Sequence, residues 1–239
     1  MGDDAALLEV VSSANIACGF HAGDPRIMDR TVADCVARGV NIGAHPSFPD
    51  LVGFGRRTVD ATAEEVRTDV TYQLGALQAF ARAHGTRVSH LAPHGRLGNL
   101  VAVREDYARA VVDAVERVDP DLIVLAQDGQ LAERAAAAGL PVAIVGIADR
   151  AYRQDGTLVP RTEDGAVVTD GREIARRAVR MVTEGVIETI DGGDLPVRAD
   201  TILLHGDSAE AVSTSRAVRD ALEAADVTVT PLDSARLRS

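Results

Sequence analysis

The sequence predicts an α/β fold in which parallel strands alternate with helices, and three observations point to it. Short apolar runs alternate with helix-like patterns along the 239 residues, and most of these runs are continuously apolar. Aromatic residues make up only 3% of a chain that is 46% hydrophobic, so Ala, Val, Leu and Ile must form the core. Strands covered by helices have this composition. We therefore expect a mostly parallel sheet or barrel.

Seven segments have the composition of strands: residues 15–20, 40–45, 88–94, 122–127, 142–149, 201–206 and 227–232. Neither a linker nor a low-complexity tract separates them, and the chain is long enough for one large α/β domain. We expect a single (β/α) barrel domain over residues 1–239.

The helices between these strands carry boundary signals. Asp24 followed by Pro25 is an N-cap with proline at the first helical position, and Gly39 closes the same helix. Two further helices are delimited in the same way, one by the capping box of Thr62 and Glu65 and by Gly85, the other by Asp170 and Gly185. We expect the arginine-rich face of this last helix to be solvated.

The composition disfavours several classes of partner. Lys and Arg number 25 against 36 acidic residues, and the resulting net charge of −11 argues against nucleic acid or an anionic membrane as the main partner. Cys18 and Cys35 are too few for a disulfide framework, and neither a secretory leader pattern nor a long apolar span is evident. We expect a cytoplasmic protein. A homo-oligomer remains open.

Four of the six histidines follow strands. His21, His45, His94 and His205 lie where the first, second, third and sixth predicted strands end. The carboxyl ends of parallel strands meet at one face, where loops from several strands form the active site of barrels and open α/β sheets. We therefore expect these imidazoles to line a functional site.

The other two histidines lack this placement. His84 comes near a helix end, where it would interact with the helix dipole, and His90 lies inside a predicted strand. We expect His90 to be a packed residue whose ring is satisfied by neighbouring groups.

Two chemistries fit the histidines at the strand ends. Together with Asp24, Asp149 or Asp207 they could bind a divalent metal that activates water, or act as general acid and base without a metal. The sequence does not separate these alternatives. A nucleophile is disfavoured, because no G-x-S-x-G turn occurs and Cys18 is expected to be a small buried apolar group.

The loop of residues 46–57, "PSFPDLVGFGRR", leaves directly from His45 and has the length of a lid or binding loop. Arg56 and Arg57 could hold a substrate carboxylate or phosphate, or one of them could anchor the loop by ion pairs. The sequence contains no Walker-type GxxxxGK motif for a nucleotide.

Several motifs together resemble the LamB/YcsF family, regarded as the A subunit of bacterial 5-oxoprolinase. They are "SSANIACGFHAGDPRIMDRTV", "GVNIGAHPSFPDLVGFGRR", "YQLGAL", "PHG" with Asn99, "ADRAY" with "LVPR", and "HGD". The resemblance implies an irregular TIM-like (β/α) barrel of the glycoside hydrolase/deacetylase type. It also implies hydrolysis of the lactam 5-oxo-L-proline to L-glutamate, with ATP and Mg²⁺ as co-substrate and with partner subunits B and C, one of which would hold the ATP.

The same resemblance assigns roles to individual residues. The implied catalytic residues are His21, His45, His94, Asp149, His205 and Asp207. The implied substrate-binding residues are Asn15, Asp24, Arg56, Arg57, Asn99 and Arg150. If a divalent metal is bound, we expect His21, His45 and His94 to be its ligands.

The sequence also departs from the family pattern. The usual "KPHGALYN" is here "APHGRLGN", with Ala92, Arg96 and Gly98 in place of lysine, alanine and tyrosine, and Val145 stands where the family tends to carry glutamate. These changes keep open a non-catalytic or substrate-diverged relative. Fold analogy keeps open a metal-dependent hydrolase of the deacetylase type.

A further departure concerns the start of the chain. The family usually opens with a strand of the type "DLNCDLGE", whereas this chain begins "MGDDAALLEV". We therefore expect the barrel to lack the family's first strand. Because a missing strand would expose an unpaired edge, we expect either a truncated gene start or an artificially shortened chain rather than a natural variant.

Overall fold

The computed structural model describes residues 4–237, which form two compact units. We call residues 12–143 with 231–237 the larger unit, and residues 4–11 with 144–230 the smaller unit. The prediction of one barrel domain over residues 1–239 stays a prediction.

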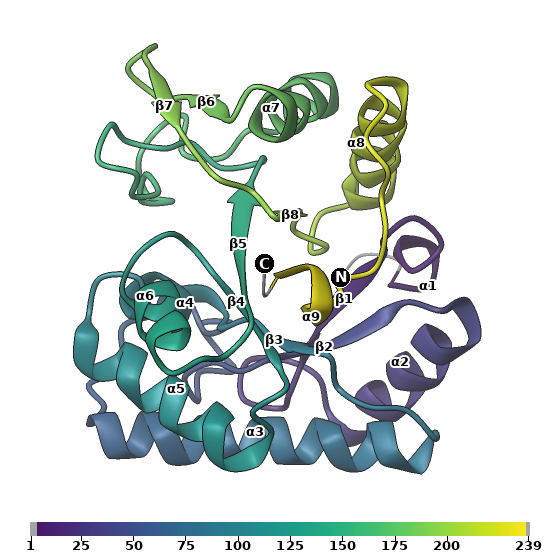
Figure 1. Ribbon diagram of the computed structural model, residues 1–239, viewed down its shortest axis with the longest axis vertical. Coiled ribbons are helices and arrows are strands. Elements are labelled where there is room, and N and C mark those ends of the chain that lie inside the picture. Colours follow the sequence, from purple (N-terminus) through teal and green to yellow (C-terminus); the bar gives the residue numbers. More distant parts are fainter. Residues whose placement is uncertain (1–3, 238–239) are drawn as a thin grey trace. The chain divides into compact units, whose positions relative to one another are not determined.

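Parallel strands form the centre of the larger unit (Figure 1). They are β1 (Ser13–Ala17), β2 (Asn41–His45), β3 (His90–Leu91) and β4 (Ile123–Ala126), in that order across the sheet. In register, Ala17 pairs with His45 and Ala44 with Leu91, so the carboxyl ends of neighbouring strands lie together. The order continues through β5 (Val142–Ile147), which begins in the larger unit, to β8 (Thr201–Leu203). The predicted parallel α/β class is confirmed.

The helices of the larger unit are α2 (Pro25–Arg38), α3 (Ala63–Ala83), α4 (Gly95–Val101), α5 (Glu105–Val118), α6 (Gln130–Ala137) and α9 (Ser234–Leu237). Two of them, α2 and α3, begin and end where the sequence predicts. Asp24 caps α2, whose end carries Gly39 with a positive φ of 66°. Thr62 and Glu65 form the predicted capping box of α3. These local signals therefore set the helix boundaries.

Aliphatic side chains build the core of the larger unit, as the composition predicts. Val70, Leu74 and Leu77 recur at helical spacing along α3 and are fully buried. Helix α3 packs against α5, whose buried Tyr107 donates its hydroxyl to the carbonyl of Ala61. Each buried Val or Leu contributes about 1.5–3 kcal/mol, which fixes these two helices against one another.

The smaller unit combines α1 (Asp4–Leu7), most of β5, α7 (Gly171–Thr183), β6 (Val186–Glu188), β7 (Asp194–Pro196), β8 and α8 (Ala211–Ala224). Strands β5 and β8 are parallel, and β6 and β7 form an antiparallel pair that the sequence analysis did not anticipate. Helix α7 is capped by Asp170, as predicted, and packs against α8.

One prediction about the chain holds only in part, and another is wrong. The arginine face of α7 is not wholly solvated, because Arg177 is buried and donates to the carbonyls of Ala148, Arg150 and Glu188. No strand forms over residues 227–232. Pro231 lacks the N–H that a ladder needs, and the carbonyl of Leu232 instead accepts from the Asn41 side chain at 2.8 Å.

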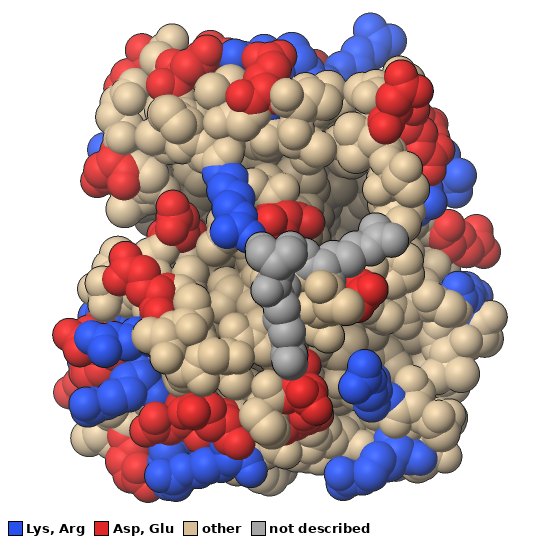
Figure 2. Space-filling view, in the orientation of Figure 1, with Lys and Arg blue, Asp and Glu red and all other residues tan. Residues whose placement is uncertain are grey.

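The surface carries both signs of charge. On the face shown in Figure 2, acidic and basic side chains are interspersed. Within residues 4–237, none of the helices combines the length and apolar character that crossing a bilayer requires.

Candidate functional site

Three histidines of the larger unit gather at the carboxyl ends of its strands. His45 is the last residue of β2, His21 follows β1, and His94 follows β3 and precedes α4. One ring nitrogen from each lies within 4.8 Å of the other two. The ring of His21 stacks on that of His94, with centroids 3.8 Å apart and 5° between the planes. We call these residues the histidine cluster.

Backbone carbonyls fix the protons on two of these rings. Nδ1 of His45 lies against the carbonyl oxygen of Ala92, and Nε2 of His94 lies 2.8 Å from that of Phe54. A carbonyl can only accept, so both of these ring nitrogens carry hydrogen and donate. In neutral rings the lone pairs then sit on Nε2 of His45 and Nδ1 of His94, and these two atoms are 3.0 Å apart. Facing lone pairs repel, so this contact requires a cation, either a proton on one ring or a metal ion.

The third ring is buried and neutral. His21 is only 3% exposed, and its Nδ1 is buried without a hydrogen-bond partner. Burial, together with the neighbouring His94 and Arg56, lowers the pKa of His21 to about 3. Its ring therefore keeps a lone pair at neutral pH.

The loop of residues 46–57 is anchored by a carboxylate. Asp50 is buried and accepts from the backbone N–H of Gly53 at 2.9 Å and from Nε of Arg57 at 2.9 Å. The hydrogen bond from Arg57 lowers the pKa of Asp50. In this structure Arg57 makes the loop-anchoring ion pair, which is one of the two roles that the sequence leaves open.

The tip of this loop touches the cluster. Phe54 has a positive φ of 53°, its carbonyl accepts from His94, and its ring meets that of His21 edge-on with centroids 5.4 Å apart. Gly55 has a φ of 65°, and a Cβ there would lie 2.8 Å from Cδ2 of His94. The guanidinium of Arg56 lies 5.0 Å from the centroid of the Phe54 ring. The loop therefore approaches the cluster closely only because residue 55 has no side chain.

Asn15 lies against a different histidine. Its Oδ1 is 3.0 Å from Nε2 of His90, whose Nδ1 is 2.8 Å from Oγ of Ser89. The prediction that His90 is packed and satisfied is confirmed, and burial lowers its pKa to about 4. Gly43 makes room for the ring, since a Cβ there would lie 2.0 Å from Nε2 of His90.

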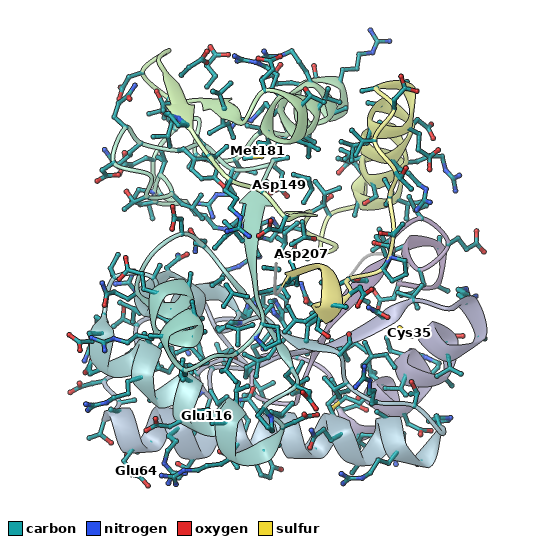
Figure 3. The ribbon with its side chains drawn as sticks, viewed as in Figure 1. Cys35, Glu64, Glu116, Asp149, Met181 and Asp207 are labelled. Atoms are coloured by element: carbon teal, nitrogen blue, oxygen red, sulfur yellow. The ribbon has the colours of Figure 1, made fainter. Side chains whose placement is uncertain are left out.

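The smaller unit holds an aspartate–histidine pair, formed by Asp149 after β5 (Figure 3) and His205 after β8. Oδ2 of Asp149 lies 2.7 Å from Nδ1 of His205 and 3.1 Å from its backbone N–H. Nη2 of Arg161 is 3.0 Å from Nε2 of the same ring. A guanidinium can only donate, so Nε2 accepts and the proton sits on Nδ1, donated to the carboxylate. Oδ1 of Asp149 is buried without a hydrogen-bond partner.

Other predicted residues are engaged locally or exposed. Arg150 is buried and donates to the carbonyls of Val159 and Ala166, which holds the segment between them. The side chain of Asp24 caps α2. Asn99 and Asp207 are exposed.

The positions that depart from the family pattern have structural consequences. Ala92 is buried, and its carbonyl orients His45. Arg96 donates to Oγ1 of Thr58 at 3.0 Å. At Gly98 a Cβ would lie 2.5 Å from the carbonyl oxygen of Pro93, so a larger residue requires a backbone shift. Val145 is buried in β5 of the smaller unit.

The sequence analysis missed two groups that determine which ring nitrogen of a histidine carries the proton. The carbonyl of Phe54 sets the proton on His94, and the flanking glycines of "GFG" were the available signal. Arg161 sets the tautomer of His205, and it belongs to the "LVPR" segment that carries the family resemblance. Both act through contacts between distant segments.

Comparison with known proteins gives a consistent picture. A model of the LamB/YcsF family matches residues 1–237. The 5-oxoprolinase A subunit of Streptomyces avermitilis is 52% identical over 228 residues, which cover 95% of this chain and 91% of that protein. A 5-oxoprolinase A subunit of Pseudomonas syringae pv. tomato is 47% identical over 237 residues, covering 99% and 93%.

A solved structure has the same fold. The crystal structure of a lactam utilization protein from Thermus thermophilus superposes with a TM-score of 0.91 at 46% identity, and covers 97% of this chain and 93% of that one. This likeness confirms the fold class predicted from the sequence and is in keeping with a TIM-like (β/α) barrel.

Proposed function

This chain belongs to the LamB/YcsF family, and from that premise we propose that it is the A subunit of a 5-oxoprolinase, which opens the lactam of 5-oxo-L-proline to L-glutamate. The observation that carries the proposal is the identity of 47–52% to proteins named as 5-oxoprolinase A subunits, over 95–99% of the chain. The proposed partners are subunits B and C. The proposed co-substrate is ATP with Mg²⁺, held by one of these partners.

The reaction requires activation of a stable amide. Water must add to the ring carbonyl carbon, the C–N bond must break, and the leaving nitrogen must gain a proton. Transfer of a phosphoryl group from ATP to the lactam oxygen, with ADP as the leaving group, would make that carbon more electrophilic. Once the C–N bond has broken, a second water would hydrolyse the resulting acyl phosphate to the carboxylate of glutamate and inorganic phosphate. The protein must then supply a proton acceptor for water and a proton donor for nitrogen.

The aspartate–histidine pair has the geometry of a proton acceptor. Asp149 holds the imidazole of His205 in the tautomer whose Nε2 lone pair faces outward, and it would stabilise the imidazolium after a proton is taken up. In this structure Arg161 donates a hydrogen bond to Nε2 of His205. This nitrogen would therefore accept a proton from the reactants only once the guanidinium moves to an anionic group. The carboxylate of 5-oxoproline and its phosphorylated oxygen are such groups.

Reconstitution tests the proposal. The chain is mixed with B and C subunits of a relative, and 5-oxoproline-dependent ATP hydrolysis and glutamate release are measured. We expect both activities together, and neither without this chain. A complex that assembles but stays inactive, beside an active complex containing the Streptomyces avermitilis protein, would overturn the catalytic role.

That second result would favour a substrate-diverged or non-catalytic relative. Ala92 and Gly98 flank His94, and Val145 stands in β5, at the positions where the family pattern carries lysine, tyrosine and glutamate. Restoring the family residues in one variant, Ala92→Lys with Val145→Glu, would then be expected to restore turnover. Gly98 is left unchanged because a side chain there meets the Pro93 carbonyl.

A further inference from the structure

Two ring nitrogens of the histidine cluster face each other, and a third is buried without a hydrogen-bond partner. Nε2 of His45 and Nδ1 of His94 face each other at 3.0 Å, while the opposite nitrogens of both rings donate to backbone carbonyls. Nδ1 of His21 is buried without a hydrogen-bond partner. A buried polar atom left unpaired costs about 1–3 kcal/mol, so such an arrangement persists where something else satisfies it.

A shared proton satisfies only part of the cluster. One extra proton between His45 and His94 would turn their contact into an N–H···N hydrogen bond. It would leave Nδ1 of His21 as it is, buried and unpartnered. A metal ion, in contrast, can accept a lone pair from all three rings at once.

We propose that His21, His45 and His94 bind a divalent transition-metal ion of the zinc class, with one ring nitrogen from each residue as a ligand. Zinc–nitrogen bonds are about 2.0–2.1 Å, and with tetrahedral angles they place ligand nitrogens roughly 3.3 Å apart. The His45–His94 distance of 3.0 Å is close to this value, and the three nitrogens already lie within 4.8 Å of one another.

The surroundings of the rings match those of metal-binding histidines. A ligating imidazole usually donates its other N–H to a carbonyl or carboxylate, which fixes the tautomer and the direction of the lone pair. His45 does this with the Ala92 carbonyl and His94 with the Phe54 carbonyl. Gly55 allows the loop carbonyl to come this close. The fold therefore orients His45 and His94 before any ion binds, whereas the His21 ring, which is stacked on that of His94 with 5° between the planes, must turn about its side-chain bonds to direct its lone pair at the same ion.

Three neutral ligands leave the ion with its full charge and an open position. Such a centre binds an anion or a polarised oxygen as a fourth ligand. A carboxylate or a lactam carbonyl would fit that position, and both occur in 5-oxoproline.

Metal binding can be measured without any assay of the proposed activity. The full chain is stripped with a chelator and titrated with Zn²⁺ in a calorimeter, and with Co²⁺ while its visible spectrum is recorded. We expect one ion per chain, tetrahedral Co²⁺ absorption bands, and X-ray absorption that reports nitrogen ligands. Absence of stoichiometric binding to the wild-type chain, or sulfur ligation from Cys18, would overturn the proposal.

Variants locate the site. His21→Ala and His45→Ala should each weaken Zn²⁺ binding by at least about 100-fold, whereas His84→Gln, whose ring pairs with Asp29 at the end of α3, should bind as the wild type does. Circular dichroism checks that each variant is folded. If a variant does not fold, the Co²⁺ spectrum and ligand count of the wild type still decide the question. Unchanged binding in both folded variants would refute the assignment.

Because ATP, 5-oxoproline and subunits B and C are absent from these titrations, their result is independent of the 5-oxoprolinase proposal. Metal binding with an inactive complex would support the site and the alternative of a metal-dependent hydrolase. An active complex without metal binding would support the proposed function alone.

Discussion

The two histidine sites differ in the groups that contact their ring nitrogens. In the aspartate–histidine pair of the smaller unit, the N–H of His205 meets a carboxylate and its lone pair meets the guanidinium of Arg161. In the histidine cluster of the larger unit, two N–H groups meet backbone carbonyls and the lone pairs face one another. The first arrangement is suited to moving a proton, and the second to holding a cation. Histidines at equivalent places in the sequence pattern thus support different chemistry.

The largest expected effect comes from the carboxylate of the pair. Asp149→Asn keeps the shape of the side chain, but its amide can donate to Nδ1 of His205 and so favour the other tautomer. We expect kcat of the reconstituted complex for glutamate release to fall by about 10²–10⁴-fold. Zn²⁺ binding by the cluster should not change. Asp164→Asn, an exposed position, serves as the control, and wild-type turnover of Asp149→Asn would remove the pair from the reaction.

His90 belongs to neither site, and its burial should make the stability of the fold depend on pH. Burial lowers the pKa of His90 to about 4 in the folded chain, against 6.5 for an ordinary histidine. The unfolded chain therefore binds more protons between these values. The contribution of neutral, buried His90 to the free energy of unfolding is fully present above pH 6.5. It is lost as the pH falls toward 4, by up to about 3 kcal/mol.

Urea unfolding between about pH 7 and pH 4.5 measures this loss, and NMR titration of the His90 ring tests its source. His21, whose pKa is about 3, adds to the loss in the same direction. A His90 ring that titrates near pH 6.5, the ordinary value, in the folded chain would contradict the prediction.

Glycine at the loop tip links the fold to the cluster. Gly55→Ala introduces a side chain at a φ of 65° and 2.8 Å from Cδ2 of His94. Gly39→Ala is a matched control, because its φ is 66° and no atom lies within 4 Å of the added Cβ. We expect unfolding free energies lower by about 1 kcal/mol for the control and about 2–3 kcal/mol for Gly55→Ala, with weaker Zn²⁺ binding only in the latter. Equal losses of unfolding free energy in the two variants would show that a side chain at residue 55 does not clash with His94.

The smallest expected effect distinguishes the two roles of Arg57. Its side chain is 64% exposed and pairs with the buried Asp50. If it anchors the loop, Arg57→Gln should lower the unfolding free energy by about 1 kcal/mol or less and speed proteolysis within residues 46–57, with KM for 5-oxoproline unchanged. A large rise in KM with unchanged stability would assign it to substrate binding instead.

Local signals predicted the ends of three helices correctly, whereas one strand and several polar contacts were missed or wrongly assigned. The caps at Asp24, Thr62 and Asp170 are contacts between residues two or three apart, so the sequence contains both partners. Strand pairing depends on segments far apart, and the apolar run at 227–232 was wrongly assigned because its composition does not reveal a neighbour. Arg177 was misjudged for the same reason: the carbonyls that hold it are 11 to 29 residues away.

The sequence by itself determined the α/β class, the ends of the three helices capped by Asp24, Thr62 and Asp170, and the placement of His21, His45, His94 and His205 at the carboxyl ends of strands. These follow from periodicity and from short-range hydrogen bonding. Only the tertiary structure decided which nitrogen of each ring carries the proton, because carbonyls of Ala92 and Phe54 and the guanidinium of Arg161 reach the rings across 40 to 47 residues. A histidine becomes a base or a ligand through the partner of its other nitrogen, and that partner is supplied by the fold.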